Sequence, residues 1–193
     1  ADPTVDANLA DLIAKVREVG ADAGFAYDGD SDRAGFVDEK GGIIRGDQAL
    51  ALFSREILAK HKGAKIIFEV KCSQALIDDI KAHDGVPIMY RTGHSFIKKK
   101  IKDEHAMIAG EMSGHFFFAD DYPGYDDGIY ASGRMAKIIS ASKARLSELV
   151  DTIPHYFSTP EIRVKVPEEV KFQCVEDVKA EFQRMKGVEL ITV

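Results

Sequence analysis

The chain has 193 residues, which is enough for one large domain or two small ones. Its composition, 45% hydrophobic and 30% charged, is that of a globular protein with a sizeable core and a charged surface. The formal net charge of -6 argues against nucleic acid or an anionic membrane as the main partner. No apolar run approaches the roughly 20 residues that span a bilayer.

The cysteines indicate the compartment of the protein, and the two ends of the chain indicate whether it is a fragment. Cys72 and Cys174 belong to no Cys-x-x-Cys or Cys/His grouping, and no basic-then-apolar leader is present, so we expect reduced thiols in a cytoplasmic protein. The chain begins Ala-Asp-Pro without Met. It ends on residues 190–193, which resemble the start of a strand, so we expect a fragment of a longer protein.

The first forty residues predict a helix followed by antiparallel strands. Apolar residues at helical spacing predict a helix that stops at Gly20, and the run Ala23–Tyr27 predicts a strand. Strands at residues 35–37 and Ile43–Ile44 flank a glycine-containing turn at residues 39–42. The apolar positions of the helix are Leu9, Leu12, Ile13, Val16 and Val19.

The middle of the chain alternates strands with short helices. Asp47 is the expected N-cap of a helix with apolar positions in residues 50–57. Further helices are expected to begin after Ser73 and Gly93. The expected strands cover residues 65–70, 86–90 and 106–109. This alternation predicts an α/β layer fold.

The last part of the chain predicts the opening of a further domain. Pro154 and Pro160 bracket an expected hinge, and the segment beyond Pro160 is too short to form a domain of its own. The expected elements are a strand at residues 116–118, a long helix at 129–142, a strand at 161–166 and an amphipathic helix at 168–185.

Residues 28–33, the acidic loop, read Asp-Gly-Asp-Ser-Asp-Arg directly after a strand. Carboxylates at alternate positions of a turning backbone can converge, and Asp28, Asp30 and Asp32 are the hard oxygen ligands that Mg²⁺ prefers. Two carboxylates ~4 Å apart repel by roughly 4 kcal/mol at an effective dielectric constant near 20. Arg33 could partly offset that repulsion, or could hold a phosphate.

Two other interpretations of the acidic loop compete with a magnesium site. An EF-hand requires glycine at the sixth loop position, where this chain has Arg33, and paired flanking helices, which the pattern lacks. The EF-hand is therefore excluded. A solvated acidic turn remains as plausible as a cation site when this motif is taken alone.

Residues 110–115, the glycine loop, read Gly-Glu-Met-Ser-Gly-His after an expected strand. The two glycines let the backbone approach a ligand, and Glu111 and Ser113 offer an acceptor and a hydroxyl suited to sugar hydroxyl groups. His115 could act as a general acid or base. From these letters alone, an ordinary glycine-rich turn with a capping serine is favoured.

Residues 91–98, the basic segment, read Arg-Thr-Gly-His-Ser-Phe-Ile-Lys. A glycine turn entering a helix exposes backbone N–H groups and forms a natural anion site. Arg91, His94 and Lys98 would add positive charge, and Lys71, at the end of another strand, could reach the same crevice. The lysines that follow, at positions 99, 100 and 102, are typical of a solvated helix face.

In this order and spacing the three segments resemble the α-D-phosphohexomutase family. The acidic loop is similar to the family's metal loop, and the glycine loop to its sugar-specificity loop. The Lys-Cys-Ser-Gln run at Lys71 and residues 91–95 are similar to segments that line its active site. The resemblance implies a three-layer α/β/α domain with a mixed sheet, flanked by partial domains. Residues 1–42 would end domain 2, residues 43–154 would form domain 3, and residues 155–193 would begin domain 4.

The resemblance also implies a chemistry, the transfer of a phosphoryl group between the 1- and 6-positions of a hexose through a bisphosphate. The implied partners are mannose and glucose phosphates, and the glycine loop favours an enzyme that accepts both sugars. Asp28, Asp30 and Asp32 would hold Mg²⁺. The implied catalytic residues are His115, for proton transfer, and Arg33. The implied substrate-binding residues are Glu111, Ser113, Lys71, His94, Arg91 and Lys98.

The sequence departs from the family in lacking its phosphate carrier, a serine in a Thr-Ala-Ser-His-Asn-Pro-like loop, and its arginine- and serine-rich phosphate loop. Neither Ser31 nor Ser113 has the context to replace the carrier, so this chain alone is expected to lack mutase activity. Two other functions stay open. One is a metal-dependent phosphatase with an aspartate nucleophile, and the other is a non-catalytic metal- or sugar-phosphate-binding module.

Overall fold

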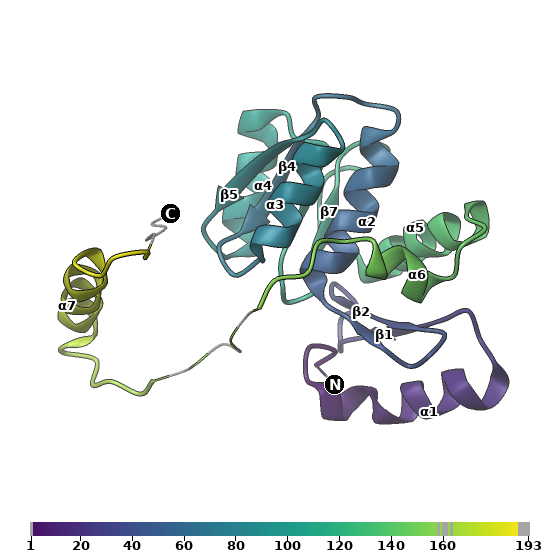
Figure 1. Ribbon diagram of the computed structural model, residues 1–193, viewed down its shortest axis with the longest axis horizontal. Helices are drawn as coiled ribbons and strands as arrows, with labels where there is room; N and C mark the ends of the chain where they lie inside the picture. Colours follow the sequence, from purple (N-terminus) through teal and green to yellow (C-terminus); the bar gives the residue numbers. More distant parts are fainter. Residues whose placement is uncertain (1, 158, 160–161, 163, 189–193) are drawn as a thin grey trace. The chain divides into compact units, whose positions relative to one another are not determined.

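The computed structural model describes residues 2–157, 159, 162 and 164–188. They fall into two compact units, Ala1–Tyr156 and Phe157–Val193. The larger unit contains two sheets, one of three strands and one of four, with helices packed on them (Figure 1).

The smaller sheet is antiparallel, with strand order β1-β2-β3, and it follows a helix. The helices before it are η1 (Asp6–Leu9) and α1 (Ala10–Val19). Its strands are β1 (Ala23–Tyr27), β2 (Ala34–Asp38) and β3 (Ile43–Ile44). These confirm the elements expected for this part of the chain. Gly20 ends α1 in the left-handed region (φ 65°), where its N–H bonds to the carbonyl of Val16. Val16 of α1 and Leu9 of η1 pack with Val37 of β2, so the helix lies on one face of this sheet.

The larger sheet is mixed, with strand order β5-β4-β6-β7. Strand β4 is parallel to β5 and β6, whereas β7 is antiparallel to β6. Its strands are β4 (Lys65–Glu69), β5 (Val86–Tyr90), β6 (Ile108–Gly110) and β7 (Phe116–Phe118). The helices between them are α2 (Gly46–Leu58), α3 (Gln74–Ala82) and α4 (His94–Glu104).

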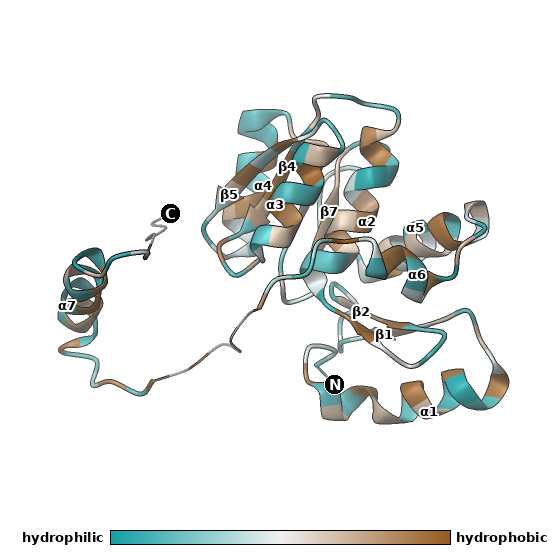
Figure 2. Ribbon diagram, in the orientation of Figure 1, coloured by the Kyte–Doolittle hydropathy of each residue, from teal (hydrophilic) through white to brown (hydrophobic). Residues whose placement is uncertain are grey.

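Both faces of the larger sheet are covered by helices, as the alternation of its side chains shows. Ile66 and Phe68 pack into the core formed with α2 and α3, whereas Ile67 faces the opposite side and packs with Ile97 and Ile101 of α4. A strand buried on both faces has a nearly continuous apolar sequence, which Figure 2 shows along β4. The domain is therefore a three-layer α/β/α domain with a mixed sheet, as expected.

Phenylalanine side chains join the two sheets. Phe36 of β2 contacts Phe53 of α2 with ring centroids 5.9 Å apart, and Phe53 contacts Phe116 and Phe118 of β7 at 5.1 and 5.0 Å. Such pairs contribute about 0.5–1.5 kcal/mol each beyond their buried area. The sheets therefore share one apolar core, which fixes the loops at their edges relative to one another.

Helix α5 (Gly128–Ala141) lies at the expected place, whereas α6 (Leu146–Asp151) was not expected. Arg134 of α5 is 7% exposed, and its guanidinium pairs with Glu56 of α2 and with Asp120, which is 2.8 Å away. Lys137 reaches Glu56 from the exposed side, at 2.7 Å. This buried ion-pair network ties α5 to α2.

Two local expectations were wrong. The N-cap of α2 is Arg45, whose backbone is extended (ψ 158°) and whose N–H donates to the side chain of Gln48 at 2.9 Å. Asp47 lies inside the first turn and is buried. Its carboxylate accepts the N–H of Ser73 at 3.0 Å and so ties the start of α2 to the start of α3. Strand β6 begins at Ile108, two residues later than expected.

The smaller unit contains α7 (Lys171–Gln183), inside the range expected for the last helix. Of the strand expected at residues 161–166, the described residues Ile162 and 164–166 are not in a strand. The rest of that strand, Pro160 of the expected hinge and the strand-like end at 190–193 lie outside the described residues. Among the described residues, no helix is long and apolar enough to cross a membrane.

We expect Arg134→Met to lower the free energy of unfolding by about 3 kcal/mol, because it leaves the nearly buried carboxylate of Asp120 without its partner and Glu56 with lysine partners alone. Lys137→Met is the matched control, and since Lys137 is half exposed its loss should cost less than about 1 kcal/mol. Urea denaturation measures both variants. Equal effects would contradict a special role for the buried guanidinium.

Acid should remove part of the stability that Arg134 contributes. Burial alone would raise the pKa of Asp120, but the hydrogen bonds from Arg134 outweigh burial and hold this pKa below its ordinary value. A carboxylate with a lowered folded-state pKa stabilises the fold above its unfolded pKa, near 3.9, and this stabilisation is lost as pH falls through the folded pKa. The difference in unfolding free energy between the wild type and Arg134→Met should therefore shrink below about pH 4.

Candidate active site

The acidic loop leaves β1 and turns sharply before β2. Ser31 occupies the left-handed region (φ 62°), and its carbonyl accepts the N–H of Gly128 at 2.9 Å. This turn brings ligand oxygens of Asp28, Asp30 and Asp32 within 4.8 Å of one another. The three carboxylates expected to converge therefore do so.

Arg33 turns its guanidinium back toward carboxylates. Its Nε donates to Asp28 at 2.6 Å, and its Nη1 lies 3.2 Å from Asp2. Burial would raise the pKa of Asp28, but the hydrogen bonds from Arg33 lower it on balance. Burial raises the pKa of Asp32, and although His115 opposes this, the charges of Asp28 and Asp30 add to it. Arg33 thus relieves only part of the repulsion in the loop.

The glycine loop lies directly against the acidic loop. The N–H of Ala34 donates to the carbonyl of Gly114 at 3.0 Å, and Arg33 and His115 form an isolated antiparallel bridge. Gly114 has φ +89°, and a Cβ there would lie 2.6 Å from the carbonyl oxygen of Ala34. Only glycine permits this approach, which places His115 beside Asp32.

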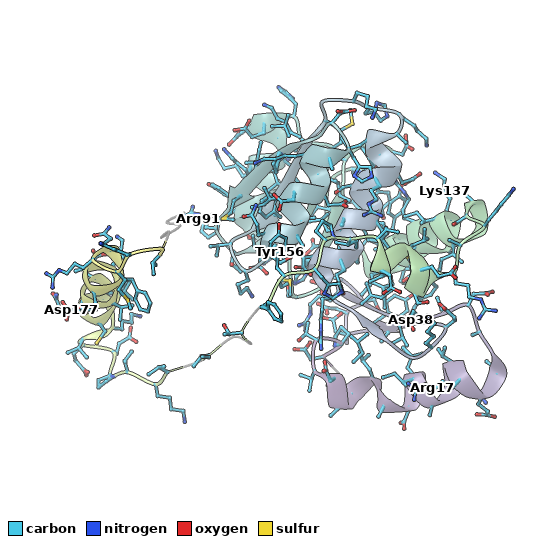
Figure 3. All side chains as sticks on the ribbon, in the orientation of Figure 1. Arg17, Asp38, Arg91, Lys137, Tyr156 and Asp177 are labelled. Carbon is cyan, nitrogen blue, oxygen red and sulfur yellow. The ribbon has the colours of Figure 1, made fainter. Side chains whose placement is uncertain are left out.

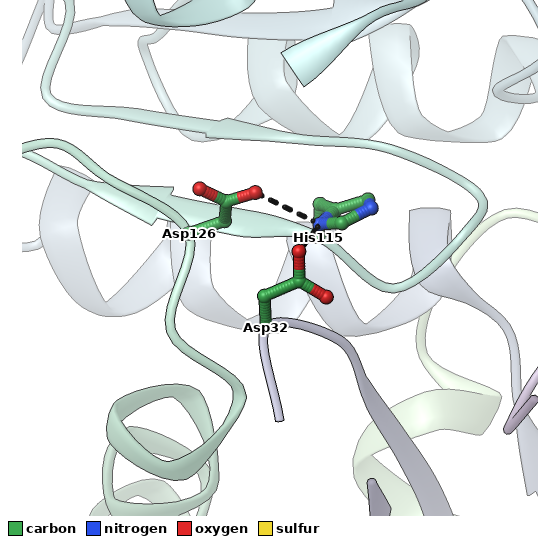
Figure 4. Close-up of side chains that lie close together, drawn as sticks. All are labelled: Asp32, His115 and Asp126. Carbon is green, nitrogen blue, oxygen red and sulfur yellow. Dashed lines mark ion pairs between the residues drawn. The ribbon is translucent and has the colours of Figure 1, made fainter. Parts of the chain in front are cut away.

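His115 lies between two carboxylates (Figure 4). Its Nδ1 is 3.0 Å from Asp126 and 3.7 Å from Asp32. Burial would lower the pKa of His115, but contact with Asp126 and the charges of Asp32 and Glu111 raise it on balance. The imidazole is therefore held near carboxylates that favour its protonated form.

Asp126 was missed by the sequence analysis. Its side chain is 5% exposed and lies 2.6 Å from the Nζ of Lys98 as well as beside His115. Burial would raise the pKa of Asp126, but His115 and Lys98 hold it well below its ordinary value. A local signal existed in the Asp-Asp-Gly run before α5. Asp127 caps the helix by accepting the N–H of Tyr130 at 2.8 Å, so Asp126 is not needed as the cap.

The carboxylate of Glu111, a residue of the glycine loop, contacts the basic segment. It is 3% exposed and accepts the N–H of Gly93 at 2.8 Å and the hydroxyl of Ser113 at 3.3 Å. Lys71 lies close by, with its Nζ 3.4 Å from the buried carboxylate of Glu69. Glu69 is a second residue that the sequence analysis missed, because a charged residue at the end of a strand carries no local signal of burial.

Only some side chains of the basic segment lie near His115 and Asp126. The ring of His94 stacks near that of His115, with centroids 6.2 Å apart, and Lys98 reaches Asp126. Arg91, which is labelled in Figure 3, contacts none of these groups. Its guanidinium carbon lies 3.5 Å from the centroid of the Phe96 ring. Among the described residues, Arg91 is therefore not joined to the other expected site residues, and Lys71 reaches them only through Glu69.

The assembled groups can support several elementary operations. The three carboxylates form a hard-oxygen donor set for a divalent cation. The imidazole of His115, buttressed by Asp126, is suited to move a proton. The N-terminal turn of α4, with His94 and Lys71 nearby, is suited to an anionic group. The arrangement fits a small ligand that carries both hydroxyl and phosphate groups.

Two family models match nearly the whole of the larger unit. Phosphoglucomutase/phosphomannomutase α/β/α domain II matches residues 1–42, and α/β/α domain III of the same family matches residues 45–157.

Known proteins resemble the chain over most or all of its length. A phosphomannomutase/phosphoglucomutase of Pseudomonas syringae is 47% identical over 94% of this chain, and a phosphoglucomutase of Neisseria gonorrhoeae is 44% identical over 100% of it. The solved structure of a phosphoglucomutase/phosphomannomutase family protein from Burkholderia thailandensis superposes with a TM-score of 0.89 at 39% identity, covering 100% of this chain.

The chain spans only 39%, 42% and 40% of the length of these three proteins. The motifs of the acidic loop and the glycine loop, the three-layer domain and the sequence identity agree with one another. The chain therefore belongs to the phosphoglucomutase/phosphomannomutase family, the α-D-phosphohexomutases.

Proposed function

We propose that this chain is the part of a phosphomannomutase/phosphoglucomutase that carries the metal and sugar half-sites. The parent enzyme would interconvert hexose 1-phosphate and hexose 6-phosphate through a hexose 1,6-bisphosphate. The observation that carries this proposal is the pairing of the acidic loop with the glycine loop, which sets His115 beside Asp32. Mannose and glucose phosphates are the proposed partners, since relatives are named for both sugars.

Membership of this family suggests a metal cofactor, and we assign it as Mg²⁺ held by Asp28, Asp30 and Asp32. The residues fit this ion, because three carboxylates converge within 4.8 Å while the guanidinium of Arg33 pairs closely with just one of them, Asp28. A bound cation would remove the remaining repulsion and would polarise a phosphate oxygen.

The proposed residue roles follow from the contacts. His115 transfers a proton to or from a sugar hydroxyl, and Asp126 orients its ring. Arg33 is assigned as a catalytic residue because its hydrogen bond to Asp28 holds the acidic loop in place. The proposed binding residues for the sugar and phosphate are Glu111, Ser113, Lys71, His94, Lys98 and Arg91. For Arg91, this role requires its side chain to leave Phe96.

The domain assignment is part of the same proposal. Residues 1–42 would complete domain 2, residues 43–154 would form domain 3, and residues 155–193 would open domain 4. The family-model boundaries support this division. A cytoplasmic location is proposed from the free thiols of Cys72 and Cys174.

The 193-residue chain alone should not interconvert glucose 1-phosphate and glucose 6-phosphate, because the family's carrier serine has no counterpart in it. Joined to the flanking segments of the Pseudomonas syringae relative, the chain should regain turnover, and His115→Ala should remove most of it. A coupled assay for glucose 6-phosphate measures all three proteins.

Each other outcome of this assay has a distinct meaning. Robust turnover by the isolated chain would show that it needs no external carrier. Hydrolysis of simple phosphate esters by the chain would favour a phosphatase with an aspartate nucleophile. Sugar-phosphate binding without turnover in the joined protein would favour a non-catalytic module.

The acidic loop should bind Mn²⁺, used as a spectroscopic substitute for Mg²⁺. Asp30→Asn should weaken Mn²⁺ binding at least about tenfold, since two opposite unit charges 4 Å apart attract by about 4 kcal/mol at an effective dielectric constant near 20. Asp22→Asn, an exposed change just before β1, is the matched control and should leave binding unchanged. Electron paramagnetic resonance titration of the 193-residue chain measures both. Equal affinities in both variants would identify the loop as a solvated turn.

A further inference from the structure

Glu69 is a fully buried carboxylate to which the proposed chemistry gives no task. It is the last residue of β4 and is 0% exposed. Its Oε1 accepts the N–H of Met112 at 2.7 Å, and its Oε2 accepts the hydroxyl of Thr92 at 2.5 Å. One carboxylate thus holds a donor from the basic segment and a donor from the glycine loop.

Glu111 makes the complementary pair of contacts. Glu111 belongs to the glycine loop. Its Oε1 accepts the N–H of Gly93 in the basic segment, and its Oε2 accepts the hydroxyl of Ser113. Strand β4 lies between β5 and β6, so the two loops leave strands that are not neighbours. Within the described residues they share no backbone hydrogen bond. The two carboxylates therefore hydrogen-bond directly to both loops, and Asp126, which lies beside Lys98 and His115, adds a third polar link between them.

A buried carboxylate needs donors to offset its lost hydration, and charge-assisted hydrogen bonds are stronger and shorter than neutral ones. Glu69 has two such donors, and the ammonium group of Lys71 lies 3.4 Å away. Moving either loop would leave part of the carboxylate unsatisfied. The arrangement therefore resists any change in the separation of the loops.

We propose that Glu69 is a positioning residue that holds the basic segment and the glycine loop at a fixed separation. A ligand that carries a phosphate and hydroxyl groups is then recognised by both loops at once, without a further cost of ordering them. This inference rests on the proposed function for its ligand class, the hexose phosphates. We call the hydrogen bonds that Glu69 and Glu111 accept from the two loops the brace. The existence of the brace does not depend on the proposed function.

Thr92→Val tests the brace, because it removes one hydrogen bond to Glu69 with little change of shape. In the 193-residue chain, the amides of Gly93 and Met112 should exchange with solvent about tenfold faster, as expected for one lost hydrogen bond. Glucose 1-phosphate should bind about tenfold more weakly, whereas inorganic phosphate and glucose, each of which needs one loop, should bind within about twofold of the wild type. Nuclear magnetic resonance measures exchange and binding together.

Thr152→Val is the matched control. The Thr152 hydroxyl donates to the carbonyl of Leu149 at the end of α6 and accepts a hydrogen bond from Arg55. Neither partner belongs to the two loops, so this variant should change neither exchange at Gly93 and Met112 nor binding. Glu69→Gln should reproduce the effects of Thr92→Val more strongly. If Glu69→Gln fails to fold, the exchange and binding measurements on Thr92→Val still test whether the brace exists.

Three results separate the alternatives. Unchanged exchange in Thr92→Val would overturn the brace. Equal weakening of all three ligands would overturn positioning and leave Glu69 a general structural role. If the wild type bound none of the three ligands, the proposed function would fail in this chain, and the exchange rates alone would decide whether the brace exists.

Discussion

The candidate site depends on one close backbone contact, between the end of the acidic loop and the glycine loop. The N–H of Ala34 reaches the carbonyl of Gly114, and any side chain at Gly114 would collide with the Ala34 carbonyl. Because His115 follows Gly114 directly, this contact decides which carboxylates surround its ring. The acidic loop, which follows a strand of one sheet, and His115, which lies next to a strand of the other, therefore come together in one site.

Buried carboxylates hold the rest of the site in place. Asp126 lies against His115 and Lys98, and Glu111 and Glu69 cross-link the glycine loop and the basic segment. A buried carboxylate is costly unless donors surround it, so each one restricts the positions of the groups that satisfy it. The phenylalanine cluster joins the two sheets but makes no hydrogen bond that orients a polar side chain of the site.

Most of the fold could be predicted because its signals are local. Apolar periodicity located α1 and the larger-sheet strands, and glycine marked the end of α1. The N-cap of α2 was misplaced because Asp47, a common capping residue, is bonded instead to Ser73 in another helix. Helix α6 was missed because its six residues carry too short a pattern for periodicity.

The sequence by itself determined the three segments of the site, their chemical types and, through their order and spacing, the family. Short motifs could do this because their residues are neighbours along the chain. Only the tertiary structure decided the partners: Asp126 for His115, Phe96 for Arg91, and Glu69 for Thr92 and Met112, which lie 23 and 43 positions away from it. A charged residue has no sequence pattern that marks it as buried, and its hydrogen-bond partners are set by which strands lie side by side.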